Sequence, residues 1–211
     1  MNAVVVPTVT ALNTSDYQKQ LQKIQRFADR IHLDFMDGIF APTKSIDITD
    51  AWWQPGPVVD LHVMYKKPLE ELENLIALKP HMIIIQAEAE GVKEFLDELD
   101  GLGIKKGLAL LQETLVEDIE KLLPKLDHVL IFSGSLGKFG GKVDVNLLHK
   151  AQMLKKLKPS IEVGWDGGIN DKNAVMLAAG GVDVLNVGGF IQKAYSAEIA
   201  YDKLVTAIGD N

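Results

Sequence analysis

Short apolar stretches recur along this chain at intervals of about 20 to 30 residues, and segments with helical spacing separate most of them. Only the second connection, residues 39–57, lacks a clear helical pattern. Strands that alternate with helices, without a linker-like break in composition, predict a parallel sheet with right-handed crossovers. Eight stretches have the length of a strand: AVVVP (3–7), RIHLDF (30–35), VVDLHVM (58–64), HMIIIQ (81–86), KKGLALL (105–111), HVLIF (128–132), IEVGW (161–165) and VDVLNV (182–187).

The length of 211 residues suits one closed barrel. We therefore expect the α/β class, with a single (β/α)8 TIM barrel domain spanning residues 1–211; an open doubly wound sheet is the alternative. Helical segments are expected to include residues 15–30, where Ser15 can cap the first turn, and residues 116–126.

Charge and composition exclude several classes of function. The chain has a formal net charge of −7 and a hydrophobic content of 47%. A net acidic protein lacks the basic excess that neutralises phosphates, so we expect neither nucleic-acid nor membrane-surface binding. Without cysteine, disulfides and thiolate metal sites are impossible. The first residues do not resemble a signal peptide and no apolar window reaches membrane-spanning length, so a cytoplasmic location is expected.

Polar side chains stand at the C-terminal ends of three expected strands. His32 and Asp34 lie two residues apart and so share one face of their strand, and His62 repeats the pattern on the third strand. Asp166 follows the seventh strand. In a parallel barrel these ends meet at one mouth, so the four side chains are expected to converge on a divalent metal ion.

Each of these residues also has a purely structural interpretation. A single strand histidine is usually a hydrogen-bonded core residue, which we expect for His81 and His128, while His149 lies on an expected helix and faces solvent. Asp37 before Gly38 can be a turn former. The convergence of four such groups favours the metal site over these alternatives.

Glycine-rich turns follow the last three expected strands. They occur within residues 137–142, 167–168 and 187–190. Such turns let backbone N–H groups face an anion, and barrels often bind phosphate after strands seven and eight. The alternative is that these glycines only form turns. The expected phosphate-binding glycines are Gly140, Gly141, Gly167, Gly168, Gly188 and Gly189.

Three motifs resemble the ribulose-phosphate 3-epimerase family. IHLDFMDGIFAP is similar to its signature H-x-D-x-M-D-G-x-F-x-P, DLHVM to its second histidine motif and WDGGI to its late aspartate motif. Thr8 stands where the family usually has serine. The resemblance implies a barrel of the ribulose-phosphate-binding type, a phosphorylated ketose as substrate and a homo-oligomer.

The same resemblance implies roles for individual residues. His32, Asp34, His62 and Asp166 would hold one divalent ion (zinc, manganese, iron(II) or cobalt), with Asp34 and Asp166 as the catalytic bases. Thr8 and His62 would contact the substrate. Met36, Met64 and Phe132 would shield the reaction intermediate from water.

The implied reaction interconverts D-ribulose 5-phosphate and D-xylulose 5-phosphate. Inverting C3 requires removal of a proton beside a carbonyl and return of a proton to the opposite face, through a 2,3-enediolate. Two carboxylates on opposite sides are the minimal solution, and a metal ion would stabilise the negative charge.

Departures from the family pattern fall on the substrate side. Gln86 replaces a common histidine, Gly189 replaces a serine, and the loop after the sixth strand has Lys138 in place of a glycine. Two alternatives therefore stay open: epimerisation of another ketose phosphate, such as a hexulose 6-phosphate, and a noncatalytic sugar-phosphate-binding barrel. Related lyase barrels use Asp-x-Lys-x-x-Asp, which no lysine here matches.

Overall fold

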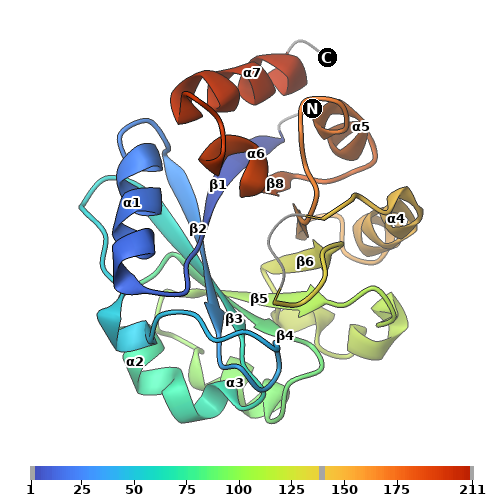
Figure 1. Cartoon of the computed structure of the whole chain (residues 1–211). Helices are drawn as coiled ribbons and strands as arrows, with labels where there is room; N and C mark the ends of the chain where they lie inside the picture. Colours follow the sequence, from blue (N-terminus) through green and yellow to red (C-terminus); the bar gives the residue numbers. More distant parts are fainter. Residues whose placement is uncertain (1–2, 138–140, 210–211) are drawn as a thin grey trace.

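The computed structural model describes residues 3–137 and 141–209, and its strands close into a parallel barrel (Figure 1). Each strand pairs with its sequence neighbours, and β8 pairs with β1. The expected (β/α)8 TIM barrel is confirmed, and the open sheet is excluded because β8 pairs with β1. The strands are β1 (Val4–Thr10), β2 (Arg30–Met36), β3 (Val58–Met64), β4 (Met82–Gln86), β5 (Lys105–Leu110), β6 (His128–Phe132), β7 (Glu162–Asp166) and β8 (Val184–Val187).

The helices lie outside the strands, as Figure 1 shows for α1, α4, α5 and α7. The second connection contains only a short 3-10 turn, Ile48–Asp50. The α-helices are α1 (Thr14–Ile24), α2 (Leu72–Ala77), α3 (Val92–Glu98), α4 (Leu148–Leu157), α5 (Ala174–Ala179), α6 (Gly189–Gln192) and α7 (Ala197–Gly209).

Two local predictions were wrong. Residues 116–126 form two 3-10 turns, Val116–Ile119 and Leu123–Lys125, instead of one helix. Pro124 explains the break, since proline has no N–H to donate and its ring clashes with the preceding turn of a helix. The first helix is capped by Asn13 and not by Ser15, because the Asn13 side chain accepts a hydrogen bond from the Asp16 N–H at 2.9 Å.

The core consists of an apolar layer between the strands and the helices and a small apolar cluster inside the barrel. Ile31, Leu33 and Phe35 on β2 point outward into the main apolar cluster and are at most 1% exposed. Four inward-facing residues from three neighbouring strands, β4, β5 and β6, fill this part of the barrel interior. They are Met82, Ile84, Ala109 and Leu130.

A charged network occupies the opposite end of the barrel from the expected site. Arg30 donates to Asp60 at 2.6 Å and, through two nitrogens, to Glu162 at 2.8 Å. The Nδ1 atom of His128 lies 2.7 Å from the same Glu162 carboxylate. His128 is thus a hydrogen-bonded structural histidine, as expected, and Asp60 pairs with an arginine at the N-terminal ends of the strands.

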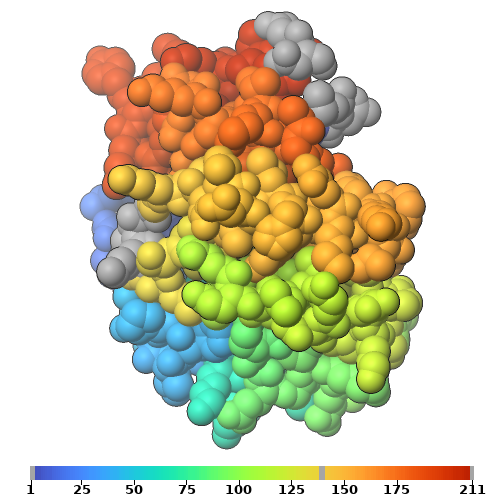
Figure 2. Space-filling view, turned by 90° about the vertical axis from the view of Figure 1, so that its right-hand side faces the viewer, coloured from blue at the N-terminus to red at the C-terminus, as the bar shows by residue number. Residues whose placement is uncertain are grey.

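The chain winds around the barrel in sequence order. Figure 2 shows this on one side, where green segments at the bottom give way to yellow, orange and red segments toward the top. Within the described residues, no helix is both long and apolar enough to cross a membrane.

Candidate active site

A cavity of about 550 Å³ opens at the C-terminal ends of the strands. Residues from β1, β2, β3, β6, β7 and β8 line it, together with loops that follow the strands and residues of α1 and α6. Asp34 and Asp166 both reach this cavity, from β2 and β7 respectively. It lies where a barrel of this type carries its active site.

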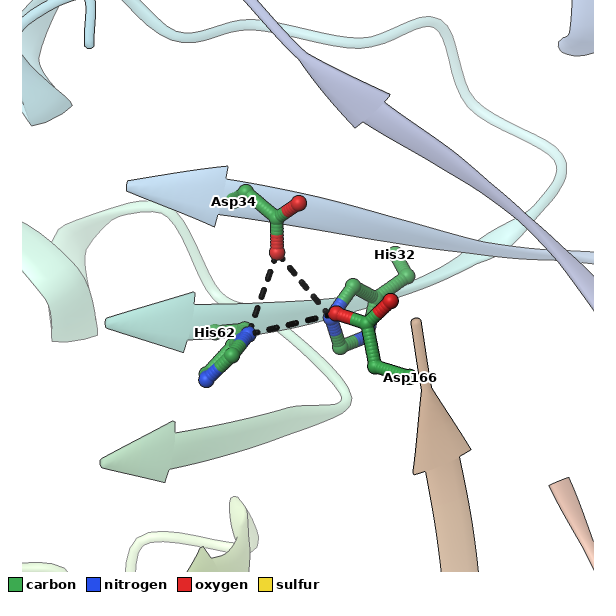
Figure 3. A group of neighbouring side chains, drawn as sticks. All are labelled: His32, Asp34, His62 and Asp166. Atoms are coloured by element: carbon green, nitrogen blue, oxygen red, sulfur yellow. Dashed lines mark hydrogen bonds and ion pairs between the residues drawn. The ribbon is translucent and has the colours of Figure 1, made fainter. Parts of the chain in front are cut away.

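Two histidines and two aspartates converge at the base of the cavity, and Figure 3 shows them pointing toward one another from β2, β3 and β7. Asp34 Oδ1 lies 3.3 Å from His32 Nε2 and 3.1 Å from His62 Nδ1. Asp166 Oδ2 lies 3.9 Å from His62 Nδ1. One donor atom from each of the four residues lies within 4.8 Å of the others.

This donor set fits a divalent cation. Nitrogen and oxygen ligands about 2.0–2.2 Å from a tetrahedral ion lie about 3.3–3.6 Å apart, close to the separations found here. Both histidines are fully buried; among residues 3–137 and 141–209, Nδ1 of His32 has no hydrogen-bond partner and Nε2 has the Asp34 carboxylate beside it, at 3.3 Å and outside hydrogen-bond geometry. Buried polar atoms that lack a well-formed partner are costly, so a cation between His32 and Asp34 would satisfy this edge of the ring. The group can hold a metal ion; the role of each residue as a ligand stays a prediction.

The two carboxyl groups differ in proton affinity. Burial and the nearby charge of Asp34 raise the pKa of Asp166 to about 7. Burial also favours protonation of Asp34, but the close histidines outweigh it and hold the pKa of Asp34 below its usual range. Burial lowers the pKa of His62 despite the neighbouring carboxylate. One ionised carboxylate and one readily protonated carboxyl group therefore share a cavity.

Thr10 orients Asp34, a contact that the sequence analysis missed. The Thr10 hydroxyl donates to Asp34 Oδ2 at 2.6 Å, which leaves Oδ1 for the histidines. Gln20 on α1 in turn holds Thr10, because its amide accepts from the Thr10 N–H at 3.1 Å and donates to the Thr10 carbonyl at 2.8 Å. The alternation of Thr8 and Thr10 at a strand end was the available signal.

Gln86 lies behind His62. The Gln86 side-chain nitrogen is 2.9 Å from His62 Nε2, and both residues are fully buried. If Nδ1 of His62 binds a cation, then Nε2 carries the ring proton. The Gln86 carbonyl oxygen, which has no partner among the described residues, would accept that proton once the amide turned over. Gln86 therefore contacts a candidate ligand and does not line the cavity.

The residues expected around a substrate also line this cavity, with two exceptions. His62 lies beneath it, and Gly140 lies outside the described residues. The expected residues that do line the cavity are Thr8, Met36, Met64, Phe132, Gly141, Gly167, Gly168, Gly188 and Gly189. No bound molecule shows a role for them, so their contacts with a phosphate or an intermediate stay predictions.

Close packing also explains part of the glycine pattern. A Cβ atom on Gly167 would lie 2.4 Å from the backbone nitrogen of Gly134, and the φ angle of Gly167 is +113°. The turn after β7 is thus pressed against the turn after β6. Glycine at this position is required by the backbone itself, whatever ligand the turn binds.

Asp37 forms a turn, which is the structural interpretation that the sequence analysis gave for it. Its Oδ1 accepts from the N–H groups of Ile39 and Phe40, and its Oδ2 accepts from the N–H of Lys66 in the next loop, at 2.7–2.8 Å. The carboxylate therefore ties together the loops that follow β2 and β3.

Asn186 is a further cavity residue that the sequence analysis missed. It lies on β8 in register with Asp166 on β7, is 2% exposed and lines the cavity. Its position inside the apolar run VDVLNV gave one signal, a lone amide in an otherwise apolar strand.

Solved structures share this fold. A 3-keto-L-gulonate-6-phosphate decarboxylase from Vibrio cholerae superposes with a TM-score of 0.77 at 11% identity, covering 100% of this chain and 99% of that one. A 3-hexulose-6-phosphate synthase superposes with a TM-score of 0.70 at 16% identity, covering 97% and 99%. At such low identity the likeness supports the barrel fold alone.

Sequence relatives are more specific. A ribulose-phosphate 3-epimerase of Helicobacter pylori strain 26695 is 31% identical over 218 residues, covering 95% of each chain. The corresponding enzyme of Schizosaccharomyces pombe is 26% identical, covering 94% of this chain and 90% of its own. A chloroplastic relative from Arabidopsis thaliana is 28% identical, covering 89% and 71%. Residues 4–192 match the family described as "Ribulose-phosphate 3 epimerase family". The chain therefore belongs to the ribulose-phosphate 3-epimerase family of isomerases.

Proposed function

We propose that this protein is a metal-dependent 3-epimerase that interconverts D-ribulose 5-phosphate and D-xylulose 5-phosphate. The observation that carries the proposal is the pairing of Asp34 and Asp166, from strands β2 and β7, at one cavity above two buried histidines. Family membership supplies the substrate, since relatives across nearly the full chain are named for this reaction.

His32, Asp34, His62 and Asp166 would hold the divalent ion. When bound, such an ion supplies positive charge that stabilises the negative charge developing on the substrate oxygens. Two neutral histidines and two carboxylates give the donor set a charge of −2, which a dication balances. Zinc, manganese, iron(II) and cobalt all accept nitrogen and oxygen donors, so the identity of the ion is left to experiment.

The two aspartates act as proton carriers on opposite faces of C3. One carboxylate removes the C3 proton, and the other carboxyl group returns a proton to the opposite face of the 2,3-enediolate. Thr10 keeps Asp34 fixed through its 2.6 Å hydrogen bond, so that the carboxylate does not have to reorient during turnover.

Apolar side chains protect the reacting carbon from water. Met36 and Met64 pack in one buried cluster at the cavity, and the Phe132 ring lies 6.0 Å from the His62 ring. A soft apolar wall gives water no hydrogen-bond partner near the enediolate. The phosphate is expected at the glycine turns after β7 and β8, which would place C3 between the aspartates.

The test follows the C3 hydrogen. The protein is incubated with ribulose 5-phosphate in heavy water, and xylulose 5-phosphate is analysed for deuterium, with each divalent metal and with a chelator. We expect metal-dependent incorporation of one deuterium at C3. Asp34→Asn and Asp166→Asn should each abolish turnover, while Asp202→Asn, on the exposed side of α7, should leave it unchanged. Incorporation that survives either of the first two substitutions would remove that residue from the scheme.

A hexulose 6-phosphate is the second candidate substrate. Gly189, which lines the cavity, and the loop after β6 depart from the family pattern on the substrate side. The same exchange experiment with a hexulose 6-phosphate distinguishes the two substrates. Absence of exchange with both would favour a noncatalytic sugar-phosphate-binding barrel. The homo-oligomer and the cytoplasmic location stay predictions.

A further inference from the structure

Asn186 is a buried amide whose hydrogen bonds are not made by the protein. Its side chain lines the cavity and is only 2% exposed, yet neither Oδ1 nor Nδ2 has a partner among residues 3–137 and 141–209. Leaving a buried donor and acceptor unpaired is unfavourable, and native structures rarely do so without a reason. Because Asn186 lines the cavity, a bound molecule can supply the missing partner from that side.

The position of Asn186 indicates what enters. Asn186 and Asp166 are register neighbours on β8 and β7, so their inward side chains stand side by side. Two residues after Asn186, just past the end of β8, the Gly188–Gly189 turn leads into α6, and it also lines the cavity. A molecule with its reacting carbon at Asp166 and its phosphate at that turn must pass Asn186.

Thr8 completes a polar recess on this wall. Its hydroxyl is likewise buried and without a partner among the described residues, and it lies in the cavity on β1. A Cβ atom built on Gly188 would lie 3.7 Å from Thr8 Cβ, which places Thr8 beside the same turn. The recess thus offers hydroxyl and amide groups between the carboxylate and the turn.

We propose that Asn186 is a substrate-binding residue that recognises the C4 hydroxyl of the ketose phosphate. This inference rests on the proposed function. In a 2-ketose 5-phosphate, C4 is the one carbon between the reacting C3 and the phosphate-bearing C5. An amide both donates and accepts, as a hydroxyl does, so the two groups satisfy each other. C4 is not inverted in the reaction, so the same contact serves both epimers.

A purely structural role makes the opposite prediction about stability. Val184 is the inward-facing residue before Asn186 on β8, and it is apolar and 1% exposed. If no ligand used Asn186, leucine at this position would be the better choice for a buried barrel wall. We therefore expect Asn186→Leu to melt at the same temperature as the parent or higher, while binding substrate less well.

The experiment compares four proteins on two substrates. The proteins are the parent, Asn186→Leu, Asn186→Ala and the control Val184→Ile, which adds a methylene on the same strand away from the cavity. The substrates are ribulose 5-phosphate and its 4-deoxy analogue, with exchange of the C3 hydrogen as the assay. We expect the parent to lose about 10- to 100-fold in kcat/KM on the analogue, as for one hydrogen bond to a buried group. Asn186→Leu should show that loss already on ribulose 5-phosphate and no further loss on the analogue.

Each outcome decides the inference. The inference is overturned if Asn186→Leu keeps the parent kcat/KM on ribulose 5-phosphate, or if that variant still discriminates fully between the two substrates. It is also overturned if Val184→Ile loses as much kcat/KM as Asn186→Leu. If Asn186→Leu does not fold, Asn186→Ala is judged by the same ratios. Failure of the parent to exchange C3 hydrogen refutes the proposed function, and this inference with it. Failure in the variant ratios alone refutes only the role of Asn186.

Discussion

Lys150 is a buried cation outside the cavity, and its removal gives a quantitative test of the structure. It lies on α4, is 1% exposed, and its Nζ donates to the carbonyl oxygens of Leu111, Gln112 and Thr114 at 2.8 Å each. Burial lowers the pKa of Lys150 from its ordinary value. The lysine therefore fastens the loop after β5 to α4.

The expected cost of Lys150→Met is about 2–4 kcal/mol of unfolding free energy. Methionine keeps most of the apolar stem, so the change isolates the ammonium group. Three hydrogen bonds from a charged donor are lost, each with a net value of about 1.5–3 kcal/mol. Recovery of the cost of burying the ammonium offsets part of this loss. For a chain of this size, the melting temperature should fall by about 5–15 °C.

Chemical denaturation of the parent and the variant measures the change, and Lys158→Met is the matched control. Lys158 also donates to three carbonyls, those of Leu123, Pro124 and Leu126, but it is only half-buried. We expect the control to lose less than about 1 kcal/mol, because Lys158 is more exposed than Lys150 and water can take the place of its ammonium group. Equal losses in both variants would refute the reasoning that burial decides the cost.

Four further predictions concern pH, metal binding and the loops. Burial favours the protonated form of Glu162, but the paired Arg30 outweighs it, so the pKa of Glu162 in the folded protein lies below its ordinary value. The ionised carboxylate therefore stabilises the fold above about pH 4.5, and that stabilisation is lost as the pH falls. In denaturation between pH 5 and pH 3, Glu162→Gln should therefore lose less stability than the parent. Added zinc or manganese should raise the melting temperature, because a metal at a hundredfold excess over Kd adds about 2.7 kcal/mol to the free energy of unfolding. Gln86→Leu removes the partner of His62 and should weaken metal binding, measured by titration, about 10- to 100-fold; unchanged affinity would exclude that role. Gly167→Ala should cost about 2 kcal/mol or more in urea denaturation, because its Cβ would lie 2.4 Å from a backbone nitrogen at a φ of +113°, and a parent-like midpoint would contradict the close packing of the two turns.

The sequence by itself determined the strands and their polarity. Each strand is a local pattern, so eight apolar runs and the alternation of Ile31 and Leu33 with His32 and Asp34 were readable without neighbours. The same alternation predicted that His32 and Asp34 share a face, and the motif around them identified the family. Boundaries between α-helix and 3-10 turn were less readable, as residues 116–126 show, because a single proline outweighs an apolar period.

Tertiary structure alone decided which residues of different strands meet. Thr10 reaches Asp34, Gln86 reaches His62 and Asn186 stands beside Asp166 because of the stagger between neighbouring strands. Closure of the barrel sets that stagger, and a one-residue shift would turn each side chain to the other face. No local sequence pattern predicts this stagger. The candidate ligands were therefore visible in the sequence, whereas the groups that orient them, and the unpaired amide proposed to bind the substrate, appeared only once the barrel was closed.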